Sequence, residues 1–156
     1  CVYIDDNGIY TLVNGQKNAD GTYTFTTGHF SEYAVMAKAE ADKKIAEQLN
    51  TLIKEVNLKV RTSKTAKKNI KAVVSGDITA LTDAGYTVKY KFYRSTEKAS
   101  KYTAKITKKS SVYINTKGRK GTKYYYKAKV LVYDGKTLIA QTELKQCGYG
   151  SRIWSR

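Results

Sequence analysis

The stretch KYYYKAKVLVY, residues Lys123–Tyr133, decides the fold that this sequence predicts. Read with a period of two, it places on one face Tyr124, Tyr126, Ala128, Val130 and Val132. Lysines, tyrosines and one leucine fill the alternate positions. This alternation is typical of a half-buried β-strand, because successive side chains of a strand point to opposite faces. The stretch therefore predicts a strand with an aromatic, apolar inner face and a basic outer face.

A matching strand is predicted upstream, at Tyr86–Arg94, with the sequence YTVKYKFYR. Its inner positions are Tyr86, Val88, Tyr90 and Phe92, and its outer positions are Thr87, Lys89, Lys91 and Tyr93. Two such strands in one small domain indicate a β-sandwich that carries a strongly charged sheet face.

The composition is that of a globular chain. The sequence has 156 residues, of which 41% are apolar and 14 are tyrosines, so one domain, or one domain and a fragment, can bury a core. There is no proline, so the turns must come from Gly, Asn, Asp and Ser. We expect no membrane span, because no apolar run reaches about 18 residues, and no signal segment, because there is no basic stretch followed by an apolar one. The chain opens on CVYIDD without an initiator methionine, which indicates a piece of a longer protein.

Charge is distributed unevenly along the chain. Residues 1–56 carry a formal net charge of −3 and residues 57–156 carry +19. This change predicts a boundary near Asn57 and a basic second unit. A basic unit attracts polyanions, although a lysine-rich surface also serves to keep a protein soluble and its sheet edges unpaired. The sequence leaves both interpretations open.

The first 56 residues predict a small β unit and a helix. Residues 1–35 should form three or four strands, the end of a preceding module, with turns at Asn7-Gly8, Asn14-Gly15 and Ala19–Gly21. Residues 36–56 are rich in Ala, Lys, Glu and Leu and should form a linking helix. Its apolar stripe consists of Ile45, Leu49, Leu52, Ile53 and Val56.

Residues 57–147 predict a seven-stranded sandwich of the fibronectin type III or immunoglobulin-like class. The expected strands lie near 58–61, 70–74, 86–94, 102–107, 111–115, 123–133 and 137–147, with one helical turn within 78–85. In the fifth strand either Tyr113 or the pair Val112/Ile114 points inward. In the last strand the expected inward residues are Leu138, Ala140, Thr142 and Leu144. Residues 148–156 are assigned to a polar tail.

No motif for catalysis, metal binding or cofactor binding is present. The single histidine, His29, has Ser31 and Glu32 nearby, but regular strand geometry cannot bring all three to one face. The run Asp5–Gly8 leads directly into a strand, which favours a hairpin over a calcium loop. No CxxC or phosphate-loop spacing occurs. Cys1 and Cys147 could form a disulfide, and we favour unpaired cysteines because two so distant residues are not a framework.

A family resemblance covers most of the chain. The runs AGYTVKYKFYRST and GTKYYYKAKVLVYDGKTLIAQTELKQC resemble fibronectin type III-like modules of large surface or secreted proteins from anaerobic Gram-positive bacteria. GTYTFTTGHFSEYAVM resembles the closing strands of another β-rich module in such proteins. The second strand lacks the tryptophan usual in animal fibronectin type III domains, so the core must pack differently. The resemblance implies an exported or cell-wall-associated multi-module protein, and it carries over no binding residue.

The basic outer face is the candidate functional site. If the two long strands pair, their outer faces bring together Lys89, Lys91, Tyr93, Tyr125, Lys127 and Lys129. Tyrosines between lysines could stack on sugars or bases. An anionic cell-wall polymer or acidic glycan is the expected partner, and nucleic acid is disfavoured because arginines are few and no nucleic-acid motif is present.

The sequence therefore predicts a non-catalytic structural or adhesion module that spaces neighbouring domains of its parent chain. The alternative is a carbohydrate- or polyanion-binding accessory module of a larger secreted enzyme. Both place the protein outside the cell or in the cell wall.

Overall fold

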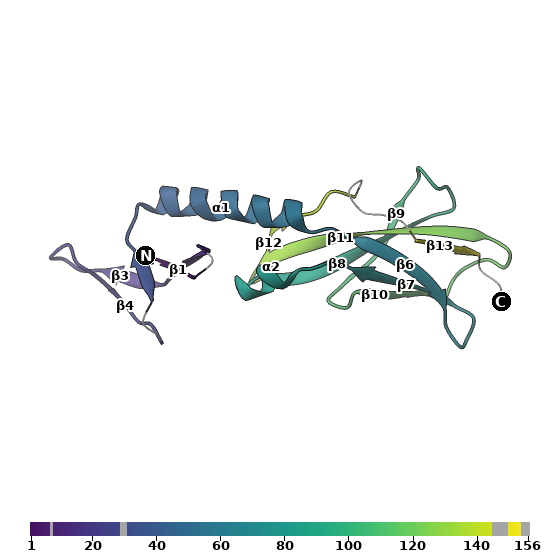
Figure 1. Cartoon of the computed structure of the whole chain (residues 1–156), viewed down its shortest axis with the longest axis horizontal. Coiled ribbons are helices and arrows are strands. Elements are labelled where there is room, and N and C mark those ends of the chain that lie inside the picture. The colour runs from purple at the N-terminus through teal and green to yellow at the C-terminus, as the bar shows by residue number, and fades with distance from the viewer. Residues whose placement is uncertain (7, 29–30, 145–149, 154–156) are drawn as a thin grey trace. The chain divides into compact units, whose positions relative to one another are not determined.

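The computed structural model describes residues 1–6, 8–28, 31–144 and 150–153 and divides the chain into two compact units, Cys1–Leu52 and Ile53–Arg156. Both units contain antiparallel strands (Figure 1), and over the described residues strand outweighs helix, which confirms the predicted mostly-β class. His29 and Cys147 lie outside the described residues, so the predictions that concern them remain predictions.

The first unit contains five short strands. They are β1 Val2–Ile4, β2 Tyr10–Leu12, β3 Gly15–Lys17, β4 Tyr23–Phe25 and β5 Glu32–Ala34. One antiparallel sheet has the order β2-β1-β5, and β3 pairs with β4. The predicted hairpin at Asp5–Gly8 is confirmed, because the Gly8 N–H donates to the Asp5 carbonyl at 2.8 Å and Gly8 adopts a φ of 74°. Strand β3 differs from the prediction of a turn at Asn14-Gly15, because GQK carries no apolar residue that marks a strand.

Helix α1, Lys38–Glu55, occupies the segment predicted to be helical. Its buried residues Ala41, Leu49 and Ile53 follow the spacing of an amphipathic helix. Within the first unit, the Gln48 Oε1 accepts a hydrogen bond from the Tyr10 backbone N–H at 2.7 Å. This bond ties the helix to the first residue of β2.

The second unit is a sandwich of two antiparallel sheets (Figure 1). One sheet has the order β10-β7-β6 and the other has the order β12-β11-β8-β9. Every predicted strand of the sandwich is present, and the helical turn is α2 Thr79–Asp83. The strands are β6 Lys59–Lys64, β7 Ile70–Ser75, β8 Thr87–Ser95, β9 Thr103–Lys108, β10 Val112–Asn115, β11 Lys123–Asp134 and β12 Thr137–Gln141.

Aromatic rings join the two sheets across the core. The Tyr113 ring on β10 lies 5.6 Å from the ring of Phe92 on β8 and 6.2 Å from that of Tyr126 on β11. Tyr113 is therefore the inward residue of its strand, while Ile114 is 45% exposed. On β7, Ile70 and Ala72 are fully buried. These three rings supply the bulk that a core without a tryptophan on β7 requires.

The last strand is shorter than the predicted strand 137–147, because residues 142–144 are not part of it, while residues 145–147 lie outside the described part of the chain. Strand β12 ends at Gln141, and the register against β11 shifts between Val132 and Tyr133. As a result Leu138 lies opposite the outward-facing Tyr133 and is 47% exposed, so its predicted inward position is wrong. Ala140 does lie opposite the inward Val132, and Thr142 is buried, as predicted.

Gly150–Ile153, assigned to a tail from the sequence, forms strand β13. It pairs antiparallel with the beginning of β11 and also touches β6, where the Thr62 hydroxyl donates to the Ser151 carbonyl at 2.8 Å. A Cβ on Gly150 would lie 2.8 Å from the Val60 carbonyl oxygen, so only glycine fits this approach. Strand β13 thus links the two sheets along one side of the sandwich.

Candidate functional site

The predicted basic face lies on β8 and β11, the two central strands of the five-stranded sheet that also contains β9, β12 and β13. Strands β8 and β11 pair antiparallel, with Lys127 opposite Tyr93, Lys129 opposite Lys91 and Leu131 opposite Lys89. Because side chains alternate along a strand, these residues share the face that points away from the core. The structure therefore brings together the six candidate residues, which we call the basic face: Lys89, Lys91, Tyr93, Tyr125, Lys127 and Lys129.

Ammonium groups lie over tyrosine rings across this region. The Nζ-to-centroid distances are 4.2 Å for Lys89 on Tyr133, 5.8 Å for Lys91 on Tyr93, 5.0 Å for Lys127 on Tyr102 and 5.4 Å for Lys123 on Tyr125. Such contacts contribute about 0.5–1 kcal/mol at exposed sites. The tyrosines thus already have cationic neighbours within the protein.

The lysines of the basic face have no carboxylate partner among the described residues. The ion pairs among the described residues lie outside the basic face: Lys38–Asp42, Lys43–Glu47 and Lys101–Glu97. Lys91 and Lys129 are direct cross-strand partners, and like charges in this position destabilise a sheet. Within the described part of the chain, the face is therefore a cluster of positive charge without compensating carboxylates.

One residue of the outer face differs from its expected environment. Leu131 alternates with the lysines of β11 and shares their face of the strand, yet it is only 5% exposed. Its cross-strand partners are Lys89 on β8 and Gln141 on β12. The outer face is therefore not a uniformly solvated charged surface.

A buried polar network joins the two sheets at one end of β8. The Arg94 Nη1 donates to the Asn115 Oδ1 at 2.8 Å, and the Asn115 Nδ2 donates to the Tyr126 hydroxyl at 2.8 Å. Asn115 and Tyr126 are fully buried. The Arg94 guanidinium also lies over the Tyr124 ring, 4.7 Å from its centroid. Sequence reasoning missed this network, although Arg94 has the same strand parity as the inward Val88, Tyr90 and Phe92.

Tyr124 is the corner tyrosine of the sandwich. Its hydroxyl accepts a hydrogen bond at 2.9 Å from the backbone N–H of Arg119, in the turn before β11. This is the tether expected of a tyrosine near the start of that strand. Tyr126, on the same face of β11, bonds to Asn115 instead.

Burial shifts the acid–base behaviour of the core tyrosines. Desolvation raises the pKa of Tyr126 strongly, and the hydrogen bond from Asn115 and the charge of Arg94 only partly oppose this effect. Burial also raises the pKa of Tyr90 and Tyr113. These three hydroxyls therefore remain protonated at neutral pH, and that of Tyr126 accepts the hydrogen bond from Asn115.

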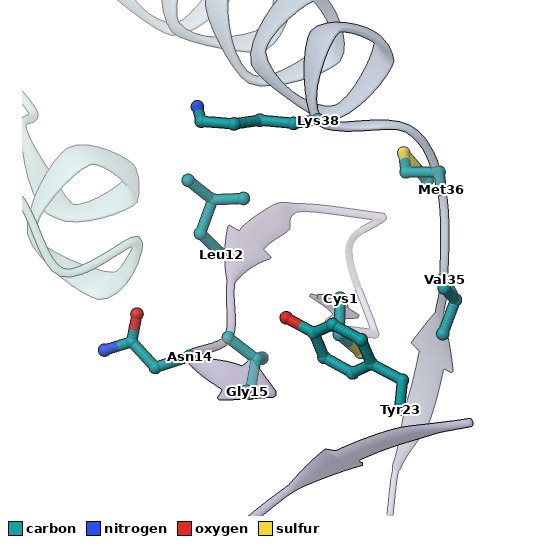
Figure 2. Close-up of a pocket in the computed structure, with 9 residues that line it drawn as sticks. Cys1, Leu12, Asn14, Gly15, Tyr23, Val35, Met36 and Lys38 are labelled. Atoms are coloured by element: carbon teal, nitrogen blue, oxygen red, sulfur yellow. The ribbon is translucent and has the colours of Figure 1, made fainter. Parts of the chain in front are cut away.

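A cavity of about 370 Å³ lies within the first unit (Figure 2). Leu12, Tyr23, Val35 and Met36 form apolar walls, and the Tyr23 ring lies against the backbone of Gly15. The Lys38 ammonium at its edge is paired with Asp42 at 2.6 Å. The nine lining residues include no Asp, Glu or His, so they offer no acid–base pair.

Two kinds of site are not found in the described part of the chain. There is no group of three or more His, Cys, Asp or Glu side chains arranged to hold a metal ion. Neither described helix is long and apolar enough to cross a membrane.

Comparisons with known proteins give a structural likeness and no family assignment. No protein-family model matches the chain, and no curated protein matches it. A solved structure is similar. It is the crystal structure of a Fn3-like protein from Clostridium thermocellum, with 20% sequence identity and a TM-score of 0.46, over 60% of this chain and 86% of that one. The strand order and register of the two sheets, and not this likeness, establish the sandwich fold of the second unit.

Proposed function

We propose that this chain is a non-catalytic structural module of an exported bacterial surface protein. It spaces or presents neighbouring domains, and its basic face adds a weak electrostatic affinity for anionic wall polymers or acidic glycans. The observation that carries the second part is the cluster of Lys89, Lys91, Lys127 and Lys129 on paired central strands without carboxylate partners among the described residues.

Electrostatic attraction fits this face better than stacking of a sugar ring. Tyr93 and Tyr125 each have a lysine ammonium within 5.8 Å of the ring centroid, so a stacked ligand must displace an internal contact. A polyanion does not have to displace these ring contacts, because it binds the lysine ammonium groups from the solvent side. This favours electrostatic binding of a polyanion over stacking of a carbohydrate on the basic face.

Elution from an immobilised polyanion tests the role of the face. The face variant replaces Lys89, Lys91, Lys127 and Lys129 by Gln. The matched control replaces four exposed lysines outside the face: Lys59, Lys67, Lys120 and Lys136. Both variants lose four positive charges from the net +16. On heparin and on lipoteichoic acid columns, we expect the face variant to elute at a clearly lower salt concentration than the control.

Equal elution of the two variants would contradict a specific role for the face, because total charge alone would then explain the retention. If the native chain passes both columns unretained at low salt, the affinity is absent and only the spacing role is left. Circular dichroism of both variants checks that the sandwich remains folded.

A further inference from the structure

A small polar cavity opens beside the buried network, between β8, β9 and β11 of the second unit. Its volume is about 160 Å³. Since a water molecule occupies about 30 Å³ of liquid, the cavity has room for a polyatomic ion and some water. Its lining residues come from the end of β8, the following loop, β9 and β11: Arg94, Ser95, Thr96, Lys101, Thr103, Lys105 and Tyr124.

Arg94 is held in this cavity as a fixed donor. Its Nη1 bonds to the buried Asn115, and its guanidinium plane is supported by the Tyr124 ring at 4.7 Å. Arginine carries five N–H donors, and the described residues engage one of them in a hydrogen bond. A guanidinium positioned in this way needs no reordering to receive a ligand with two acceptor oxygens.

A bulge in β9 adds a second positive charge. Phe92 pairs with Ile106 and the neighbouring Tyr93 pairs with Ala104, so Lys105 is the extra residue between them. Bulges re-aim side chains, and Lys105 lines the cavity together with Arg94 although it belongs to an edge strand. Lys105 has no ion-pair partner among the described residues.

The other groups around the cavity determine the charge and the chemical class of ligand that it can bind. Lys101 is neutralised by Glu97 at 2.6 Å, and Glu97 is the single carboxylate among residues 94–124, which contain ten lysines and arginines. The Ser95 hydroxyl is engaged with the Ser100 carbonyl, and the Thr103 hydroxyl donates to the Arg94 carbonyl. The charged donors that line the cavity without a carboxylate partner among the described residues are therefore those of Arg94 and Lys105.

We propose that this cavity, which we call the Arg94 pocket, binds one oxyanion of an acidic ligand: a carboxylate, sulfate or phosphate group. Arg94 provides the planar fork and Lys105 provides the second charge. A cation would be repelled, and an apolar group would leave the guanidinium without a partner. The Arg94 pocket shares no residue with the basic face, so the two proposals can fail separately.

Nuclear magnetic resonance titration of the full chain tests the proposal. The chain is titrated with sodium sulfate, sodium phosphate, sodium acetate and sodium chloride at equal ionic strength, following the Arg94 side-chain N–H and the backbone amides that line the pocket. We expect saturable shifts with at least one of the three oxyanions, at a dissociation constant on the order of millimolar, and none with chloride. The oxyanion that binds most tightly identifies the class of acidic group.

Two variants of equal charge make the result specific. Lys105→Gln should weaken binding about tenfold, whereas Lys109→Gln, an exposed lysine that does not line the pocket, should leave it unchanged. Arg94→Lys keeps the charge and should also weaken binding, because the fork is lost. If Arg94→Lys unfolds, the Lys105 and Lys109 pair still decides. Non-saturable shifts that follow ionic strength, or equal weakening by the two lysine variants, would overturn the proposal.

Discussion

At the scale of single residues, Asn115 is the polar centre of the sandwich. It is fully buried and bonds through its side chain to Arg94, Tyr126 and the Lys117 backbone. An amide at a core position is stable only when these bonds are made, because an unsatisfied buried polar group costs about 1–3 kcal/mol. The network therefore fixes how β8, β10 and β11 meet.

Tyr126→Phe should destabilise the second unit by about 1–3 kcal/mol, because it leaves the Asn115 Nδ2 without its acceptor. Urea denaturation followed by fluorescence measures the loss. Tyr90→Phe is the matched control: Tyr90 is also buried, and none of the described residues hydrogen-bonds to its hydroxyl. A loss of equal size in both variants would show that the Asn115 bond is not the cause.

The raised pKa of Tyr126 predicts a loss of stability at high pH. An unfolded tyrosine ionises near pH 10, whereas burial holds the native Tyr126 protonated above that value. Its contribution is therefore complete below pH 10 and is lost as the pH rises above it. Lysines titrate in the same range, so the measurement is the difference between the native chain and Tyr126→Phe at pH 8, 10 and 11. We expect this difference to shrink with pH, and a constant difference would refute the assignment.

At the scale of elements, the long alternating strands were predictable and the short polar ones were not. The sequence predicts β8 and β11 from Tyr86–Arg94 and Lys123–Tyr133, because each stretch repeats the apolar–polar alternation several times. GQK and GSRI form β3 and β13 without any such period, since backbone pairing and the close approach of Gly150 to β6 hold them. The basic face could be predicted from the alternation of side chains along β8 and β11 alone. The Arg94 pocket could not be predicted in this way, because it depends on the bulge in β9.

Gly150→Ala should weaken the link that β13 makes between the sheets. The added Cβ would meet the Val60 carbonyl oxygen at 2.8 Å, a backbone atom that cannot move aside without shifting β6. We expect a destabilisation of about 1–3 kcal/mol, as for other overpacked sites, measured by urea denaturation. Gly28→Ala is the control, because its Cβ would meet no atom within 4 Å. Unchanged stability in Gly150→Ala would show that β13 can shift away from β6 without a cost in free energy.

Lys129→Glu should stabilise the sheet. It replaces a like-charge cross-strand pair with Lys91 by an opposite-charge pair, a gain of roughly 0.5 kcal/mol at low salt. Lys136→Glu, in the exposed turn between β11 and β12, makes the same change of charge without a cross-strand partner and serves as the control. Thermal unfolding at low and high salt measures both. A gain that persists at 1 M salt would contradict an electrostatic origin.

At the scale of the whole chain, the two units differ in core and in charge. Of the buried apolar residues in the described part of the chain, three belong to Cys1–Leu52 and seventeen belong to Ile53–Arg156. The first unit carries a net charge of −3 and the second carries +19. The second unit therefore has the larger hydrophobic stabilisation and also the larger self-repulsion.

These differences predict how the chain opens under native conditions. In hydrogen exchange followed by mass spectrometry, amides of β1–β5 should exchange before those of β8 and β11. A unit with so few buried side chains has a low free energy of opening. Raising the salt from 0.05 to about 0.5 M should slow exchange in β8 and β11 by screening the +19 unit, and it should change β1–β5 little. The two sets of peptides come from the same sample and control for each other. Equal protection of both sets, or a salt effect of the same size in both, would show that neither core size nor charge separates the units.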